Sequence, residues 1–126
     1  MEANAKANKT VLIIEDDFAS KEFFIELLDE FDVNILTADN GTAVFDILKV
    51  SQVDLIFLDI KLPDISGLEV IKRIRNVHGD KIKVIAQTAN AFRKYTFYED
   101  AGFDGYLSKP INTSEFKSLV ANLLSL

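Results

Sequence analysis

The sequence predicts a doubly wound α/β fold, in which a five-stranded parallel sheet carries helices on both of its faces. Short apolar runs rich in Ile, Val and Leu alternate along the chain with longer segments whose apolar residues recur at helical spacing. Strict strand–helix alternation is typical of parallel sheets covered on both sides. The 126 residues and the 48% hydrophobic content fit one globular domain with a buried core.

The first strand and helix are predicted near the start of the chain. Residues 11–14 (Val-Leu-Ile-Ile) form a continuous apolar run, as expected of a strand that is covered on both faces. Residues 1–9 are small and polar, so we expect a disordered lead-in or a linker there and one domain over residues 10–126. Residues 18–31 are predicted to be a helix, because apolar side chains recur at helical spacing: Phe23, Phe24, Leu27, Leu28 and Phe31.

Two further strand–helix pairs follow in the middle of the chain. Residues 33–37 predict the second strand, and Asn40 can cap the helix after it. Residues 54–58 predict the third strand, which is again almost entirely apolar. Ser66 can cap the third helix, and Glu69, three residues later, completes a capping-box pattern.

The last two pairs complete the alternation. Residues 82–86 predict the fourth strand, and residues 90–101 predict a helix that Gly102 closes. Residues 103–107 predict the fifth strand, and Thr113 opens the final helix. Because crossovers between parallel strands are right-handed, few topologies remain for such a chain.

The composition excludes several classes of protein. The formal net charge of −6 argues against a general nucleic-acid-binding surface, and the absence of cysteine excludes disulfides and thiolate chemistry. No apolar stretch approaches the ~20 residues of a membrane span, and no signal peptide is visible. We therefore expect a soluble cytoplasmic protein that does not bind a membrane by itself.

Polar side chains stand at the carboxyl ends of the predicted strands. In open parallel sheets, ligands bind outside these ends, which all lie on one edge of the sheet. A carboxylate that ends a buried strand, as Asp59 does, is poorly placed for packing and well placed for chemistry. The residues expected to converge at this edge are Glu15, Asp16 and Asp17 after the first strand, Asp59 after the third, Gln87 and Thr88 after the fourth, and Ser108 and Lys109 after the fifth.

Clustered carboxylates need positive charge beside them. At 4 Å, two of them repel by roughly 4 kcal/mol with an effective dielectric constant near 20. Lys109 can supply one charge, and a divalent cation can supply two. A set of oxygen ligands without His or Cys points to a hard ion such as Mg²⁺, with Mn²⁺ as a substitute. A cation, a lysine and the Thr88 hydroxyl could neutralise a phosphoryl group, with Asp59 as the nucleophile that forms an acyl phosphate.

Four segments carry a resemblance to a known family: Ile-Ile-Glu-Asp-Asp at 13–17, Leu-Asp-Ile-Lys-Leu-Pro-Asp-Ile-Ser-Gly at 58–67, Gln-Thr-Ala-Asn at 87–90 and Gly-Tyr-Leu-Ser-Lys-Pro at 105–110. In this order and spacing, the chain resembles the receiver domain of two-component response regulators. The amino-acid sequences of the last two segments are most similar to those of receivers in hybrid sensor histidine kinases. The resemblance implies a flavodoxin-like fold with strand order 2-1-3-4-5.

The resemblance implies a role for each residue of the cluster. Asp59 matches the phospho-accepting aspartate, and Asp16 and Glu15 match the acidic positions that hold Mg²⁺ together with Asp59. The backbone carbonyl of Lys61 would be a further metal ligand. Lys109 would pair with Asp59 before transfer and with the phosphoryl group afterwards, and the Lys109–Pro110 bond would be cis.

The remaining roles concern the phosphoryl group and the switch. The Thr88 hydroxyl and the Ala89 amide would contact the phosphoryl oxygens, and Tyr106 would turn inward when Thr88 moves. The donor would be a phosphohistidine of a sensor histidine kinase or of a histidine phosphotransfer domain. The surface of the fourth helix, fifth strand and fifth helix would then change, and it could contact a downstream effector or a second copy. The chain would thus be a signalling domain that catalyses only its own phosphoryl transfer and slow autodephosphorylation.

Three other functions fit the sequence less well. A phosphatase of the haloacid dehalogenase type needs a second aspartate two residues after the nucleophile, where this chain has Lys61. A flavin- or nucleotide-binding module needs a Gly- or Ser/Thr-rich loop after the first strand, where this chain is acidic. A pseudo-receiver that only binds partners would not need the complete acceptor set. We expect Asp17 to be a helix cap rather than a ligand, and His78, the single histidine, to be a surface residue and not the phosphodonor.

Overall fold

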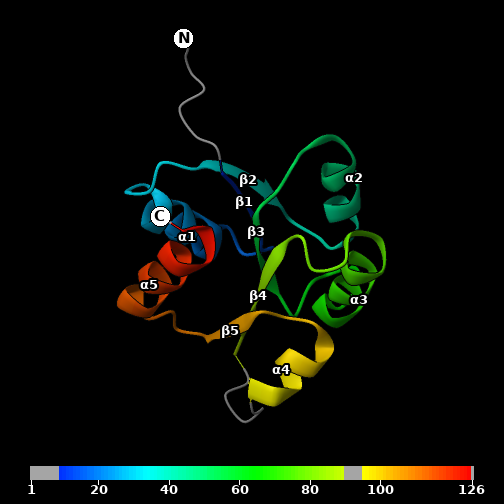
Figure 1. Cartoon of the computed structure of the whole chain (residues 1–126). Coiled ribbons are helices and arrows are strands. Elements are labelled where there is room, and N and C mark those ends of the chain that lie inside the picture. The colour runs from blue at the N-terminus through cyan, green and yellow to red at the C-terminus, as the bar shows by residue number, and fades with distance from the viewer. Residues whose placement is uncertain (1–8, 90–94, 126) are drawn as a thin grey trace.

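Strands and helices alternate along the whole described part of the chain (Figure 1). The structure is a computed structural model that describes residues 9–89 and 95–125. The strands are β1 (Thr10–Ile14), β2 (Asn34–Ala38), β3 (Leu55–Asp59), β4 (Lys83–Thr88) and β5 (Gly105–Ser108). The helices are α1 (Phe18–Leu28), α2 (Thr42–Val50), α3 (Gly67–His78), α4 (Tyr95–Ala101) and α5 (Thr113–Leu124).

The strands form one parallel sheet in the order β2-β1-β3-β4-β5. This order confirms the doubly wound flavodoxin-like architecture that the resemblance implies. Figure 1 shows three layers, with α1 and α5 on one face of the sheet and α2, α3 and α4 on the other. All strands therefore end at the same edge, where the polar residues follow them.

The core has two halves, one on each face of the sheet. On the face of α1 and α5, three phenylalanine rings pack together, with ring centroids 4.9–5.6 Å apart: Phe24, Phe57 and Phe116. On the other face, alternate residues of the same strands pack against Val44 of α2 and Ile71 of α3. Because both faces are covered, the central strands are apolar at nearly every position, which is the pattern seen in the sequence.

The predicted strands begin and end within two residues of the observed ones, whereas the end of the first helix differs by three and the start of the fourth lies outside the described residues. Helix α1 ends at Leu28 and not at residue 31, since the acidic residues that follow oppose a helix C-terminus. Phe31 still packs against the core half of α1 and α5, which explains the misleading helical spacing. Residues 1–8 and 90–94 lie outside the described residues, so the domain boundary and the start of the fourth helix at residue 90 stay predictions.

The predicted capping box of α3 is only half formed. The Ser66 hydroxyl accepts a hydrogen bond from the Leu68 amide at 3.1 Å, as expected of an N-cap. The Glu69 carboxylate instead accepts from Arg73 Nε at 2.8 Å, one helical turn further along. The i,i+4 ion pair thus takes the place of the bond back to the cap.

Arg75 joins α3 to the segments before β4 and β5. Its side chain is mostly buried, and each of its bonds is 2.7–2.9 Å long. A planar guanidinium can serve several acceptors at once, which an ammonium cannot do in the same geometry. The acceptors are the carbonyl oxygens of Gly79, Ile82 and Gly102, and the carboxylate of Asp104.

We expect Arg75→Lys to lower the free energy of unfolding by about 2 kcal/mol, because most of these charge-assisted bonds are lost. Urea unfolding followed by circular dichroism measures the change. Arg73→Lys is the matched control. Arg73 forms an exposed ion pair with Glu69 and lies over the Phe45 ring, 5.5 Å from its centroid, and a lysine can keep both contacts in part, so the change should cost under about 0.5 kcal/mol. Equal losses in the two variants would contradict a special role for Arg75.

Candidate functional site

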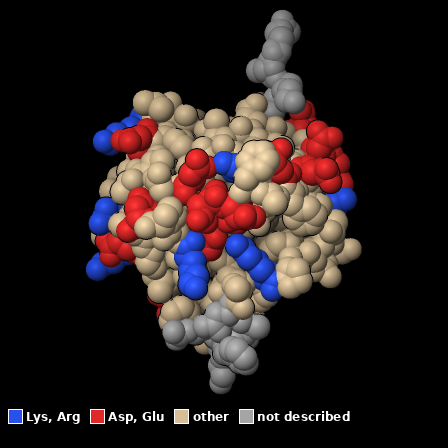
Figure 2. Space-filling model, turned by 180° about the vertical axis from the view of Figure 1, so that it is seen from behind, with Lys and Arg blue, Asp and Glu red and all other residues tan. Residues whose placement is uncertain are grey.

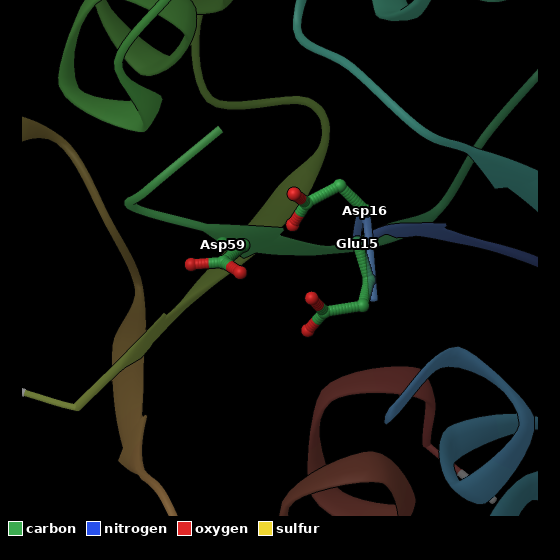
Figure 3. Close-up of side chains that lie close together, drawn as sticks. All are labelled: Glu15, Asp16 and Asp59. Carbon is green, nitrogen blue, oxygen red and sulfur yellow. The ribbon is translucent and has the colours of Figure 1, made fainter. Parts of the chain in front are cut away.

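Three carboxylates meet where β1 and β3 end. One oxygen of each of Glu15, Asp16 and Asp59 lies within 4.8 Å of the others. Figure 3 shows the three side chains reaching from the two strand ends toward a shared space. Glu15 and Asp59 are 1% and 6% exposed, so both carboxylates are largely withdrawn from water, whereas Asp16 is exposed. The register of β1 on β3 pairs Ile14 with Leu58, and Glu15 and Asp59 are the residues that follow this pair.

The carboxylates border a hollow on the edge where the strands end. Figure 2 views this side of the molecule and shows acidic side chains gathered at the centre of the face, with basic side chains beside them. The hollow has a volume of about 820 Å³. The structure thereby brings together nearly all of the predicted site residues, which line it: Glu15, Asp16, Asp59, Lys61, Thr88, Ala89 and Lys109.

Lys109 ties the two buried carboxylates together. Its ammonium Nζ donates to Glu15 Oε1 and to Asp59 Oδ2, both at 3.1 Å. The other Asp59 oxygen, Oδ1, accepts a hydrogen bond from the Lys61 amide at 2.9 Å. The Lys109–Pro110 peptide bond is cis, as the resemblance implies. Asp59 is therefore held at both oxygens and stays at the floor of an open hollow.

The charges of the cluster are only partly compensated. Burial raises the pKa of Glu15, and the negative charge of Asp59 raises it further, against the hydrogen bonds from the Asp17 amide and from Lys109. Burial alone would lower the pKa of Lys109, but the carboxylates of Asp59 and Glu15 outweigh burial and raise it. Lys109 forms ion pairs with two of the three carboxylates, Glu15 and Asp59, and its single positive charge does not balance the cluster. A hard divalent cation fits this donor set, which consists of oxygen atoms only.

Asp17 caps α1 as expected, although it also lines the hollow, and His78 lies far from it. Asp17 is the N-cap of α1, and its carboxylate accepts a hydrogen bond from the Ser20 amide at 2.9 Å. That interaction with Ser20 lowers the pKa of Asp17. His78 ends α3 at the opposite edge of the sheet, where it lines a separate hollow of about 440 Å³ with Lys49 and Lys81.

Tyr106 lies behind the hollow rather than in its lining. Its ring stacks on the ring of Tyr98, with centroids 4.8 Å apart and planes at 23°. Tyr98 is 2% exposed and itself lines the hollow, together with Thr88. The predicted switch residue thus contacts the site through an aromatic side chain of α4. The sequence signals only a crowd of aromatic residues in this helix, so the partner could not be singled out.

Gln87, which the sequence places at this edge, is buried beside Asp59 with its side-chain amide unpaired among the described residues. It lies between Asp59 and Leu107 in the sheet register and is fully buried. Among the described residues, neither atom of its side-chain amide has a hydrogen-bond partner. A buried amide without partners destabilises a fold. The sequence shows that Gln87 ends a strand, but a missing partner can be seen only in the folded structure.

We expect Gln87→Met to raise the free energy of unfolding by about 1 kcal/mol, because an apolar side chain of similar length removes the desolvated amide. Urea unfolding with an unchanged m-value would measure this gain. A loss of stability would instead reveal a partner for the amide, such as an ordered water. Gln52→Met is a suitable control, since Gln52 is exposed and follows α2.

No helix in residues 9–89 and 95–125 combines the length and the hydropathy that a membrane crossing requires.

Comparisons with known proteins agree with this geometry. The family model described as "Response regulator receiver domain" matches residues 11–121. The polar-differentiation response regulator DivK of Brucella anthropi is 32% identical over 120 residues, which cover 92% of this chain and 96% of DivK. Histidine kinase P4 of Formosa agariphila is also 32% identical, over 94% of this chain, but the chain spans only 9% of that kinase.

A solved structure extends the likeness to three dimensions. Response regulator TrrA of Thermotoga maritima, determined in complex with Mg²⁺–BeF, has a TM-score of 0.81 and 35% sequence identity. The match covers 91% of this chain and 98% of TrrA. Since the family model matches most of the chain and a relative of full length matches as well, this protein belongs to the response regulator receiver domain family.

Proposed function

We propose that the chain is a phospho-accepting receiver of a two-component phosphorelay, with Asp59 as the acceptor. The observation that carries this proposal is the setting of Asp59, which is buried, bonded to Lys109 and Lys61, and adjacent to two further carboxylates. An oxygen of Asp59 attacks the phosphorus of a partner's phosphohistidine. The new O–P bond forms as the P–N bond breaks, and the electron pair of that bond returns to the imidazole.

The other residues of the hollow support this transfer. Glu15, Asp16, Asp59 and the Lys61 carbonyl would hold Mg²⁺ or Mn²⁺, which supplies positive charge to the phosphoryl oxygens. Lys109 already contacts Asp59 and can follow the phosphoryl group without leaving the site. The Thr88 hydroxyl and the Ala89 amide line the same hollow and would donate to the phosphoryl oxygens.

The readout would be a shift of the surface of α4, β5 and α5. Movement of Thr88 toward the phosphoryl group opens space for the Tyr106 ring. Because that ring stacks on Tyr98, its inward turn would separate it from α4. We propose that the altered surface binds a downstream effector or a second copy of the chain.

The phosphodonor is proposed to be a histidine kinase or a histidine phosphotransfer domain. His78, the single histidine of the sequence, is remote from Asp59, so the donor histidine lies outside these 126 residues. On α1, the Phe18 and Phe23 side chains are 71% and 40% exposed, and Phe23 borders a hollow of about 330 Å³ that Lys109 also lines. An apolar partner surface fits this place beside the acceptor. We also propose that the chain acts in the cytoplasm and that it binds neither nucleic acid nor, by itself, a membrane.

The proposal is of a signalling domain and not of a turnover enzyme. Asp59 would catalyse only its own phosphorylation, followed by slow hydrolysis by water. Lys61 stands where a phosphatase of the haloacid dehalogenase type has its second aspartate, and its amide is bonded to Asp59 Oδ1. The described site thus offers no second aspartate at that place to activate a water.

A small acyl phosphate, such as acetyl phosphate, provides the test. With Mg²⁺, intact-protein mass spectrometry should show one added phosphoryl group per chain, which hydroxylamine removes. Chelation of the metal should prevent the modification. Absence of any modification in the presence of Mg²⁺ and excess donor would overturn the proposal in favour of a receiver that only binds partners.

A further inference from the structure

The loop between β3 and α3 (residues 60–66) carries the Lys61 carbonyl that is proposed to bind the cation. Its two ends are held by the sheet and the helix, through the bonds Ile60 N to Gln87 O at 3.1 Å and Gly67 N to Ile60 O at 2.9 Å. The same loop and Asp16 line one open hollow of about 490 Å³. The position of the loop relative to Asp16 therefore decides the shape of the cation site.

The middle of this loop is fastened to the start of α2 by Asp64. Oδ1 of Asp64 accepts from the Gly41 amide at 2.8 Å, and Oδ2 accepts from the Thr42 amide at 2.9 Å. The N-cap Gly41 has no side chain to accept a bond itself. These amide donors, that of Gly41 foremost, hold the pKa of Asp64 well below its usual range, so the carboxylate is charged at neutral pH.

The start of α2 also packs closely against the loop and against α3. A Cβ atom placed on Gly41 would lie 2.6 Å from the Ile65 side chain and 2.9 Å from that of Val70. The α2 start and the loop thus touch through both hydrogen bonds and apolar contact. Asn40 also caps the start of α2, because its Oδ1 accepts a hydrogen bond from the Ala43 amide at 2.9 Å.

We propose that Asp64 is a positioning residue for the cation site, which it serves by holding the Lys61 carbonyl in place from outside the site. The inference rests on the proposed function, because it needs the cation there. Asp64 itself is exposed, and it contacts the α2 amides rather than the carboxylates of the cluster. Its effect on the metal passes through the loop. Residues that orient a metal ligand typically change metal affinity by 10- to 100-fold when they are removed.

The test is the Mg²⁺ affinity of the unphosphorylated chain, measured by titration of backbone amide resonances. Asp64→Ala should weaken binding by about tenfold, at the lower end of the range for orienting residues. Asp64→Asn should fall between Asp64→Ala and the unmodified chain, because its amide oxygen can accept only part of the two bonds. Both variants lose the same charge, so the difference between them isolates hydrogen bonding from long-range attraction.

Asn40→Ala is the matched control for a role in helix capping alone. It uncaps α2 and leaves the loop bonds of Asp64 intact. Its Mg²⁺ affinity should stay within about twofold of the unmodified chain, although it also loses stability in urea. A similar loss of affinity in Asn40→Ala and Asp64→Ala, or unchanged affinity in Asp64→Ala, would overturn the inference. Failure of the unmodified chain to bind Mg²⁺ would overturn the proposed function and this inference with it.

Discussion

Asp59→Asn is expected to abolish phosphoryl uptake from acetyl phosphate and from any phosphohistidine donor. The amide group is a poor nucleophile, while its shape preserves the bond from the Lys61 amide to Oδ1. The change also removes one of the clustered negative charges beside Glu15. Less repulsion with Glu15 and loss of the Lys109 bond to Asp59 act on stability in opposite directions, so the variant should stay folded, and lost labelling then reports on chemistry and not on unfolding.

Mass spectrometry of the intact chain and urea unfolding together check this expectation. Asp17→Asn is the matched control, because Asp17 is a neighbouring carboxylate that lines the same hollow but caps α1. It should leave stability nearly unchanged, because asparagine caps a helix about as well as aspartate does, and it should not stop phosphorylation. Labelling that persists in Asp59→Asn would assign the acceptor to another carboxylate, and peptide mapping would then identify it.

The architecture and most of the strand-end cluster follow from the sequence because a parallel sheet leaves little freedom. Strands covered on both faces are continuously apolar, and their carboxyl ends all meet at one edge. A charged residue at or just after the end of such a run, as Asp59 and Lys109 are, must therefore lie at this edge of the sheet. The helical spacing predicts an end of α1 at residue 31, three residues too far along the chain. Phe31 is apolar because it packs against the core from beyond the helix.

The supporting contacts could not be predicted, because each depends on segments far apart in the chain. Asp64 reaches Gly41 across 23 residues, and Arg75 reaches Asp104 across 29. In the sequence, Asp64 is an ordinary turn residue after a proline, and nothing marks its partner. The site's chemical groups were thus predictable from strand ends, whereas the contacts that orient them depend on how the loops and helices pack.

Lys109→Met is expected to lower the free energy of unfolding at pH 7 by about 3 kcal/mol, near the lower end of the cost of breaking a buried ion pair. Methionine keeps most of the volume of the lysine stem but leaves Glu15 and Asp59 without their ammonium partner. Lys109 is itself 29% exposed, and water at the mouth of the hollow reduces the loss. Lys117→Met, which breaks an exposed pair with Glu30, should cost under about 1 kcal/mol.

The pH dependence gives this prediction a specific signature. Burial already raises the pKa of Glu15, so the folded chain binds a proton more readily than the unfolded chain does. Without Lys109, that pKa should rise further, and the stability lost at pH 7 should return as the pH falls toward the unfolded value of about 4.3. Mg²⁺ should also stabilise the variant more than the unmodified chain, since it replaces the missing charge. A loss that is independent of both pH and Mg²⁺ would instead reflect poor packing of the methionine.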